Sequence, residues 1–298
     1  MHNNRMQTIR KCIIPAAGFG TRFLPATKAQ PKEMLPIVDK PVIQYLVEEA
    51  VAAGITDIMI VTGRGKQAIE NHFDASFELE KTLVEKWKMK ELALVEWVAN
   101  LAHIAYVRQP LPRGDGDAIL HARAWIGDEP CLVLFGDDLI KWEKWWATQL
   151  VEAFEREWVP IIALERVSDK RVSSYGIIES SLSEGKVHRV SKFLEKPKPE
   201  ETTSRLGVIG KYIITPEVFD HLLENSTWAS KDGEIRLADA FTRMVDAGKS
   251  VYGLEMEGDR YDTGDKFGFL KATIDYALDR EDLGPQLLEF LKKRVENS

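Results

Sequence analysis

Short apolar runs alternate with helical patterns through the first 140 residues, and this alternation narrows the possible folds more than any other feature. The runs cover Cys12 to Ala17, Asp57 to Val61, His103 to Val107 and Cys131 to Phe135. Between the first two, VIQYLVEEAVAAG has apolar positions at helical spacing and ends on Gly54, as a helix C-terminus favours. This succession predicts βαβ units and therefore an α/β fold with a mainly parallel central sheet flanked by helices.

The second half of the chain is richer in β-runs, which are VPIIALE, YGIIES, VHRVSKFLE and VIGKYIIT. We therefore expect the sheet to continue and to carry a β-rich lobe. Helical spacing returns in IRLADAFTRMVDAG, FGFLKATIDYAL and QLLEFLKKRVENS. The helical stretch Ser76 to Val98 is too long for a minimal crossover, so we expect an insertion on the outside with a solvated charged face. No linker separates two units, which predicts one domain over residues 1–298.

Composition narrows the functional classes. The 298 residues are 44% apolar and 29% charged, as in an ordinary globular protein. The net charge of −7 has the wrong sign for phosphate-backbone binding, which argues against nucleic acid as a partner. No uncharged apolar run approaches the ~20 residues of a membrane span, and the first residues do not resemble a signal peptide. We therefore expect a cytoplasmic protein that does not enter a membrane, with Cys12 and Cys131 as small buried residues.

The most informative segment is IIPAAGFGTRFLPATKAQPKEMLPI, residues 13–37. An apolar strand leads into Gly18 and Gly20, where glycine lets backbone N–H groups approach a ligand such as a phosphate. A dinucleotide fingerprint would need a third glycine where this chain has Phe23, and no GK[ST] follows as a P-loop requires. The two standard phosphate-binding motifs are therefore absent from this segment.

Three cations replace them on a loop that prolines stiffen, namely Arg22, Lys28 and Lys32. A stiff loop lowers the entropy lost when these side chains are held in one place. Three cations within one short span suit a triphosphate. The alternative is that they are ordinary surface charges.

Two distant segments supply carboxylates. CLVLFGDDLI places Asp137 and Asp138 directly after an apolar strand, at the edge of the sheet where α/β proteins bind ligands. Neighbouring side chains on an extended backbone point in opposite directions, so only one should face the site. Asp262 follows a later β-run in RYDTGDK. Mg²⁺ favours one or two carboxylates together with phosphate oxygens, so such a pair is sufficient, although turn stabilisation explains each aspartate alone.

The chain resembles the sugar nucleotidyltransferases through blocks that follow one another between positions 16 and 270. They are AAGFGTRFLPATKAQPKEMLPIVDKPVIQY, IENHFDASFELE, RQPLPRGDGDAIL, FGDD, FLEKP, DGEIRLADA and YDTGDKFGFL. The first block is long and specific, and ENHFDASFELE resembles the uridylyltransferase branch. The resemblance implies a Rossmann-like nucleotidyltransferase fold with a β-rich sugar-binding lobe. It divides the domain into a nucleotide-binding half (about 1–140), a sugar-phosphate-binding half (about 141–270) and C-terminal helices (about 271–298).

The same resemblance implies an activity and a set of residue roles. The reaction is transfer of a uridylyl group from UTP to glucose 1-phosphate with Mg²⁺ as cofactor, by a homodimer or homotetramer. Arg22 and Lys32 act on the UTP phosphates, and Asp137 and Asp262 hold the metal. The implied nucleotide-binding residues are Ala17, Gly18, Gly20, Thr21, Gln109 and Gly114. The implied sugar-phosphate-binding residues are Gly176, Glu195, Lys196 and Gly210.

One segment departs from the family pattern. Relatives usually read G-L-G-H-A where this chain reads Gly-Asp-Gly-Asp-Ala over 114–118, which adds Asp115 and Asp117 beside the nucleotide. Two interpretations stay open. The carboxylates cap the helix that starts near Ala118, or Asp117 binds the nucleotide by accepting a hydrogen bond from a ribose hydroxyl.

Other readings also remain open. Uracil and thymine present the same hydrogen-bonding edge, so the runner-up is a glucose-1-phosphate thymidylyltransferase. A non-catalytic relative that binds a nucleotide sugar and regulates a partner is the alternative from another class, yet it should have lost phosphate-handling residues that this chain retains. The cluster KWEKWW, Trp142 to Trp146, is interpreted as part of an amphipathic helix or as a subunit interface.

Overall fold

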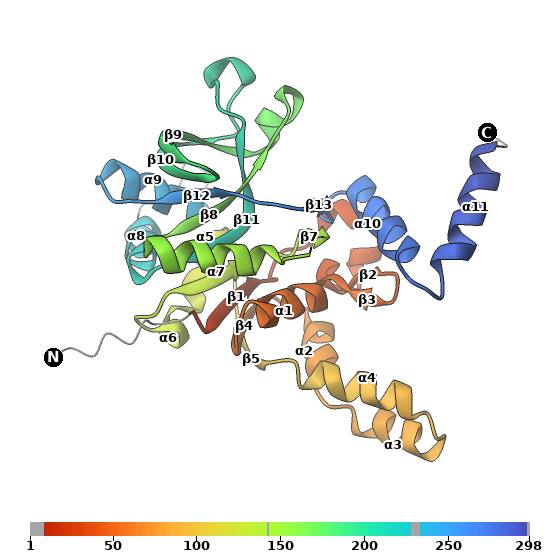
Figure 1. The fold of residues 1–298 in the computed structure, drawn as a ribbon. Helices are drawn as coiled ribbons and strands as arrows, with labels where there is room; N and C mark the ends of the chain where they lie inside the picture. The colour runs from red at the N-terminus through yellow and green to blue at the C-terminus, as the bar shows by residue number, and fades with distance from the viewer. Residues whose placement is uncertain (1–8, 142, 228–232, 297–298) are drawn as a thin grey trace.

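The computed structural model describes residues 9–141, 143–227 and 233–296 (Figure 1). Within these residues one large sheet has the strand order β5-β4-β1-β6-β11-β8-β12-β10-β9. Its strands are β1 (Lys11–Pro15), β4 (Asp57–Thr62), β5 (His103–Arg108), β6 (Cys131–Leu134), β8 (Ile161–Arg166), β9 (Gly176–Glu184), β10 (Val187–Glu195), β11 (Leu206–Ile214) and β12 (Tyr252–Glu255). Two small sheets pair β7 (Asp138–Lys141) with β13 (Asp259–Asp262), and β2 (Pro36–Ile37) with β3 (Lys40–Pro41).

Helices cover both faces of the large sheet, and other helices extend away from it (Figure 1). The helices are α1 (Val42–Ala52), α2 (Gln67–Phe73), α3 (Phe77–Glu85), α4 (Met89–Ala99), α5 (Asp115–His121), α6 (Arg123–Ile126), α7 (Trp146–Glu157), α8 (Pro216–Thr227), α9 (Leu237–Asp246), α10 (Lys266–Leu278) and α11 (Gly284–Glu296). The helix predicted before Gly54 is α1, and that glycine has a positive φ of 88°. The expected α/β class is therefore confirmed.

Within the large sheet, the strands of the first half of the chain pair in parallel with one another, and one further parallel pair, β12 with β8, lies in the second half. In the first half β1 pairs in parallel with β4 and β6, and β4 pairs in parallel with β5. Beyond β6 the sheet is mixed, because β11 is antiparallel to both β6 and β8, and β10 is antiparallel to β9 and β12. The tight turn between β9 and β10 shows the reason, since a connection this short joins only antiparallel neighbours. The β-rich lobe predicted for the second half is this mixed part.

The core lies on both sides of β1. Cys12 and Ile14 point to one face, where they join a cluster that includes residues of α1 and α7. Ile13 points to the opposite face and packs in a cluster with residues of α5, α8 and α9. This alternation is what an extended strand imposes on successive side chains. Both cysteines are buried and unbonded, as the sequence predicted.

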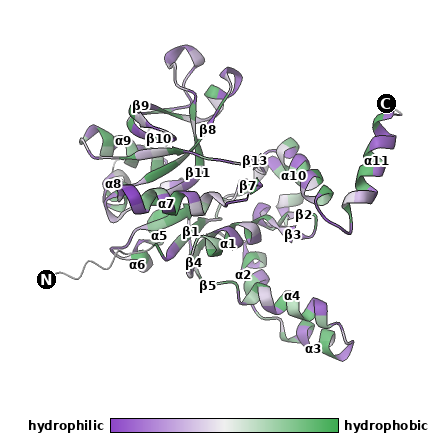
Figure 2. Cartoon of the chain, in the orientation of Figure 1, coloured by the Kyte–Doolittle hydropathy of each residue, from purple (hydrophilic) through white to green (hydrophobic). Residues whose placement is uncertain are grey.

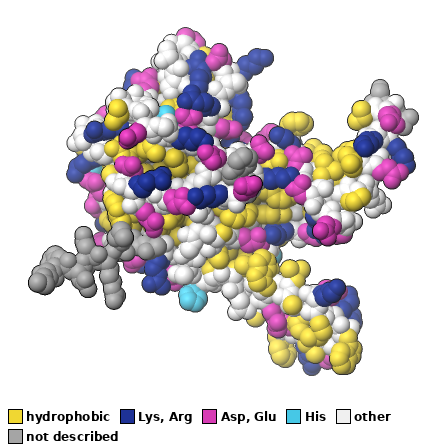
Figure 3. All heavy atoms as spheres, viewed as in Figure 1, with side chains coloured by type: hydrophobic (Ala, Val, Ile, Leu, Met, Phe, Trp, Pro, Cys, Tyr) yellow, Lys and Arg dark blue, Asp and Glu magenta, His cyan; other side chains and the backbone are white. Residues whose placement is uncertain are grey.

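The expected insertion is a helical hairpin of α3 and α4 that extends away from the body of the molecule (Figure 1). Trp87, between the two helices, has a positive φ of 56° and is 87% exposed. Other large apolar side chains on the hairpin are also exposed, among them Phe77, Leu94 and Trp97. Hydrophobic and hydrophilic residues alternate along it (Figure 2), and hydrophobic side chains gather on it in Figure 3. The prediction of a solvated charged face therefore missed an apolar surface.

The tryptophan cluster leads into α7. Trp146 begins the helix and is buried, with Nε1 donating to the carbonyl oxygen of Glu257 at 2.6 Å. Trp142 lies outside the described residues. Burial of an aromatic on an amphipathic helix is the first of the two interpretations given above. Within the ranges that the structure describes, no helix is long and apolar enough to cross a membrane.

Candidate active site

In the glycine turn after β1, Gly20 packs closely against Lys32. Gly20 has a φ of 64°, and a Cβ on it would lie 2.9 Å from Lys32 Cβ, so this position requires glycine. The Thr27 hydroxyl donates to the Gly20 carbonyl oxygen at 2.8 Å, which closes the loop. Lys32 then begins a short 3-10 helix after Pro31, whose fixed φ suits that start. The loop therefore folds back and brings Lys32 beside the turn.

The two candidate metal ligands and Arg22 converge on one point. Thr263 donates its backbone N–H and its hydroxyl to the Asp137 carbonyl oxygen at 2.7 and 3.0 Å. A Cβ placed on Gly264 would lie 3.1 Å from Asp137 Oδ2, 3.1 Å from Asp262 Oδ1 and 3.2 Å from Arg22 Nη1. Gly264 leaves this space open because it has no side chain. Three groups that are far apart in the sequence therefore share one small volume.

The second predicted cation reaches the same place. Lys32 Nζ is hydrogen-bonded to Asp137 Oδ1 and forms an ion pair with it. Lys28 has a different position, since it is exposed and lines neither of the cavities described below. Of the three cations of the loop, Arg22 and Lys32 are therefore the two that lie beside Asp137.

Asp138 has a structural role beside Asp137. It is buried and accepts from Arg260 Nε at 2.6 Å, while Arg260 Nη1 donates to Glu165 at 3.0 Å and to the Tyr175 hydroxyl at 2.9 Å. Burial raises the pKa of the Asp138 carboxyl, and the charge of Arg260 opposes that shift. The Asp138 carboxylate is therefore engaged by the protein, whereas Asp137 is partly exposed at the cavity.

A first cavity of about 270 Å³ lies beside the glycine turn. The predicted site residues among those that line it are Ala17, Gly18, Lys32, Gln109, Gly114 and Asp137. Gly114 has a φ of 103°, and a Cβ there would lie 2.4 Å from the Ile235 carbonyl oxygen, so the turn also requires glycine. Among the described residues, Gly20, Thr21 and Asp117 do not line this cavity.

A second cavity of about 550 Å³ continues from the first, with which it shares Asp115, Phe135 and Asp137. The predicted site residues among those that line it are Arg22, Asp137, Lys196, Gly210 and Asp262. Gly176 and Glu195 lie just outside this lining, where a Cβ on Gly176 would be 3.5 Å from Glu195 Oε2. Lys196 Nζ lies 3.4 Å from Glu195 Oε1.

Asp117 has other partners than the ribose hydroxyl that we considered. It is buried, and its carboxylate accepts from Gln109 Nε2 at 2.7 Å and from Arg113 Nη2 at 2.9 Å. Asp115 is the residue that acts near the helix start, accepting from the backbone N–H groups of Gly116 and Leu237 at 2.7 and 3.0 Å. The geometry therefore replaces a direct contact of Asp117 with the ribose by a contact with Gln109.

Two residues of the site, Glu33 and Arg260, were not singled out from the sequence, and the role of Asp115 was left open. Glu33 lines the first cavity, is buried and pairs with Lys66 at 2.7 Å. Asp115 lines both cavities, and Arg260 lines the second. A signal existed for Arg260, because it lies two positions before Asp262 on a β-run and so shares its face. Glu33 directly follows Lys32 in the most specific block, which was its only signal.

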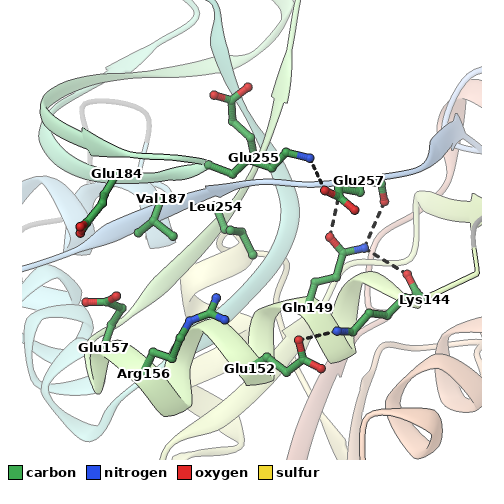
Figure 4. Close-up of a pocket in the computed structure, with 11 residues that line it drawn as sticks. Lys144, Gln149, Glu152, Arg156, Glu157, Glu184, Val187, Leu254, Glu255 and Glu257 are labelled. Carbon is green, nitrogen blue, oxygen red and sulfur yellow. Dashed lines mark hydrogen bonds and ion pairs between the residues drawn. The ribbon is translucent and has the colours of Figure 1, made fainter.

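The groove in Figure 4 lies apart from these cavities, between α7 and the strands β10 and β12. Its charged side chains bind one another: Lys144 pairs with Glu152, and Lys186 pairs with Glu257. Gln149 Nε2 donates to the Glu257 carbonyl oxygen at 3.1 Å. The groove shares no lining residue with either cavity, so it contributes nothing to this site.

The residues present fit a divalent cation that a substrate helps to bind. Within the described residues, no group of three or more His, Cys, Asp or Glu side chains is arranged to hold a metal. Asp137 and Asp262 nevertheless bring two carboxylates to one point. Mg²⁺ keeps several of its ligands as waters or substrate phosphates, so two protein carboxylates are enough.

Comparison with known proteins places the chain among nucleotide-handling enzymes. Residues 11–278 match the family model described as nucleotidyl transferase. A UTP–glucose-1-phosphate uridylyltransferase 2 of Staphylococcus saprophyticus is 50% identical over 97% of this chain and 99% of its own length. The corresponding enzyme of Bacillus subtilis is 48% identical over 96% and 97%.

Solved structures agree. A UTP-bound UGPase from Acinetobacter baumannii is 37% identical, with a TM-score of 0.87 over 95% of this chain and 98% of its own. A UDP-glucose pyrophosphorylase complexed with UDP-glucose is 39% identical, with a TM-score of 0.80 over 91% of this chain and all of its own.

Proposed function

Because this chain belongs to the nucleotidyl transferase family, we propose that it transfers the uridylyl group of UTP to glucose 1-phosphate, giving UDP-glucose and pyrophosphate. Relatives near 50% identity over almost the whole chain carry the name of this reaction. The observation that carries the proposal is the convergence of Arg22, Asp137 and Asp262 around Gly264, with Lys32 bound to Asp137.

The chemistry requires positioning and charge neutralisation. A phosphate oxygen of glucose 1-phosphate attacks the α-phosphorus of UTP in line with the departing pyrophosphate. This oxygen is already ionised at neutral pH, so the protein need not supply a nucleophile. The obstacle is that two anions must meet while charge develops on the leaving group. Arg22 and Lys32 offset this charge at the triphosphate, which lies where the two cavities join.

Asp137 and Asp262 would hold Mg²⁺ in this proposal. When bound, the ion neutralises phosphate charge and orients the triphosphate. Lys32 forms an ion pair with Asp137. When the triphosphate binds, Lys32 leaves this ion pair. Lys32 then donates to a phosphate oxygen, and Asp137 becomes available to the metal.

The sugar phosphate is assigned to the second cavity. Lys196 lines it and contributes a cation for the acceptor phosphate, and Gly210 lets the sugar approach the backbone. A Cβ on Gly210 would lie 2.8 Å from Phe135 Cβ, so a larger residue there is excluded. Glu195 lies at the rim, from which its carboxylate reaches sugar hydroxyls. Gly176 lies beside it, where a Cβ would be 2.9 Å from Phe193 Cε1 and 3.5 Å from Glu195 Oε2, so glycine leaves this rim uncrowded.

The base of UTP is assigned to the first cavity, which the glycine turn after β1 helps to form. Ala17, Gly18 and Gly114 line this cavity and present backbone groups to the nucleotide. Gly20 and Thr21 form the bend that positions Ala17 and Gly18. Gln109 recognises the base. A homodimer or homotetramer is part of this proposal, and the exposed apolar residues of α3 and α4 support it. A cytoplasmic location stays a prediction from the sequence.

The test is a pyrophosphate-release assay that crosses UTP, dTTP, ATP and GTP with several sugar 1-phosphates, with and without Mg²⁺. We expect turnover with UTP and glucose 1-phosphate that depends on Mg²⁺. Faster turnover with dTTP would instead assign the chain as a thymidylyltransferase. Binding of UTP without release of pyrophosphate under any condition would favour the non-catalytic alternative.

A further inference from the structure

We propose that Asp117 is a positioning residue for base selection, because it holds the Gln109 amide so that only its carbonyl oxygen is offered to the nucleobase. The inference rests on the proposed function, in which the first cavity receives the base of UTP. Asp117 touches no substrate itself. It acts through Gln109, which lines that cavity while Asp117 does not.

The orientation of the Gln109 amide follows from its neighbours. One end of the amide faces two acceptors, the Asp117 carboxylate oxygen Oδ2 at 2.7 Å and the Gly114 carbonyl oxygen at 3.1 Å. Only the NH₂ group can donate to two oxygens, so this end is Nε2. A flipped amide would place its carbonyl oxygen against a carboxylate and a backbone carbonyl. Both hydrogen bonds would be lost, and like partial charges would face each other.

The hydrogen bond between Gln109 and Asp117 is buried, and each of the two residues has a further partner that holds it. The Gln109 backbone N–H donates to the Thr62 carbonyl oxygen at 2.9 Å at the end of β5. Gln109 is 6% exposed and Asp117 is 3% exposed, so water competes little for their hydrogen bond. Arg113 Nη2 donates to the other oxygen of Asp117, Oδ1, at 2.9 Å, which helps to hold the carboxylate in its orientation.

The free end of the amide is then an acceptor only. Among the residues that the structure describes, none donates to Gln109 Oε1, and Oε1 is not among the buried polar atoms that lack a partner. It is therefore left to a ligand in the cavity. A glutamine that is free to rotate would offer either a donor or an acceptor, but this one has its donor group already engaged.

An acceptor at this position selects for the uracil ring. Uracil carries a hydrogen on N3 that donates to Oε1, whereas N3 of cytosine is itself an acceptor and would face Oε1 with no hydrogen between them. Sites built to pair one polar group reject an analogue that leaves the group unpaired, because the buried oxygen has lost its water. The chain therefore discriminates UTP from CTP through a residue that contacts neither.

The experiment compares kcat/KM for UTP and CTP, with glucose 1-phosphate, in the wild type and in Asp117→Leu. Leucine matches aspartate in branching and suits a buried place, but it accepts no hydrogen bond. Only the Gly114 carbonyl oxygen then holds Gln109 Nε2, so the amide turns its NH₂ toward the base more readily than in the wild type. We expect the UTP:CTP ratio to fall by about tenfold or more, with an absolute gain or a smaller loss for CTP. A ratio within about twofold of the wild type would overturn the inference.

Two further variants separate positioning from loss of structure. Asp117→Asn retains one acceptor for Gln109 Nε2, and the Gly114 carbonyl still opposes a flip, so we expect most of the discrimination to remain. A UTP:CTP ratio as low as that of the leucine variant would contradict the proposal that Asp117 fixes the Gln109 amide by accepting its hydrogen bond. Asp117→Ser is too short to reach Gln109 and replaces the leucine variant if that chain does not fold.

The Gln109→Leu background completes the cycle. Without the amide, Asp117→Leu should leave the UTP:CTP ratio unchanged, whereas a second fall would mean that Asp117 acts by another route. Absence of UTP turnover in the wild type would instead refute the proposed function. A wild type that is active with UTP but has the same ratio as its leucine variant would refute the inference alone.

Discussion

The two cavities that meet at Asp137 are built in different ways. On the nucleotide side, Gln109 and Asp117 are buried and held by hydrogen bonds before any ligand arrives. On the sugar side, the side chains of Glu195 and Lys196 are 50% and 62% exposed and contact mainly each other. A preorganised site loses little entropy when it binds, whereas an open one must order its side chains. Under the proposed assignment, the base therefore meets a preformed site, whereas the side chains that meet the sugar phosphate become ordered only when it binds.

The largest effect should come from Asp137, one of the three residues that both cavities share. Asp137→Asn removes a metal ligand and the partner of Lys32, so kcat should fall by about a thousandfold, equivalent to roughly 4 kcal/mol. The measurement is steady-state pyrophosphate release at saturating substrates. Asp220→Asn is the control, because Asp220 is a surface residue that pairs with Arg123. A loss below about tenfold would mean that the cavities do not meet at the reacting centre.

The nucleotide side is tested next by Lys32→Ala. The ammonium group stabilises charge that develops during the reaction, so kcat should fall by a hundredfold or more, by analogy with the loss of an oxyanion donor. Stopped-time assays with excess enzyme would reveal the residual rate. Near-normal turnover would place Lys32 outside the reaction and leave its ion pair with Asp137 as a purely structural contact.

A smaller and different effect is expected on the sugar side. Because Lys196 is exposed, its interaction with the acceptor phosphate is screened by solvent, and Lys196→Ala should raise KM for glucose 1-phosphate by about tenfold. KM for UTP should change little, because Lys196 lines only the second cavity. Lys198→Ala is the matched control on the same exposed segment. An equal rise in both KM values would contradict separate roles for the two sides.

The smallest effect sharpens the choice among the loop cations. Lys28 is on the same loop as Lys32 but lines neither cavity, so Lys28→Ala should change kcat/KM by about twofold at most. A loss comparable to that of Lys32→Ala would mean that the loop rearranges when the triphosphate binds.

Sequence patterns that follow backbone periodicity were the reliable ones. The strands around β1 and the helix before Gly54 were predicted because burial repeats every two residues in a strand and every three to four in a helix. The same alternation predicted that only one of Asp137 and Asp138 would face the site, but both line the second cavity, and they differ because Arg260 binds the Asp138 carboxylate. The roles themselves came from resemblance to a family, since no spacing joins Asp137 to Asp262 across the chain.

Contacts between distant segments could not be predicted. The residue pattern alone gave Lys28 and Lys32 equal weight, and the family resemblance favoured Lys32. The bend at Gly20, closed by Thr27, is what brings Lys32 beside the glycine turn. The charge and position of Asp117 suggested a ligand for ribose, yet its partners depend on how α5 packs beside the end of β5. Arg260 was missed because its role depends on contacts between strands: from β13 it donates to Asp138 on β7 and to Glu165 on β8.

The central claim is that Arg22, Lys32, Asp137 and Asp262 surround one triphosphate. A crystal structure with a non-hydrolysable UTP analogue and Mn²⁺, located by its anomalous signal, tests this most directly. We predict the metal peak between Asp137 and Asp262, with the phosphates within hydrogen-bond distance of Arg22 and Lys32. A metal peak elsewhere, or phosphates that contact neither cation, would contradict the account.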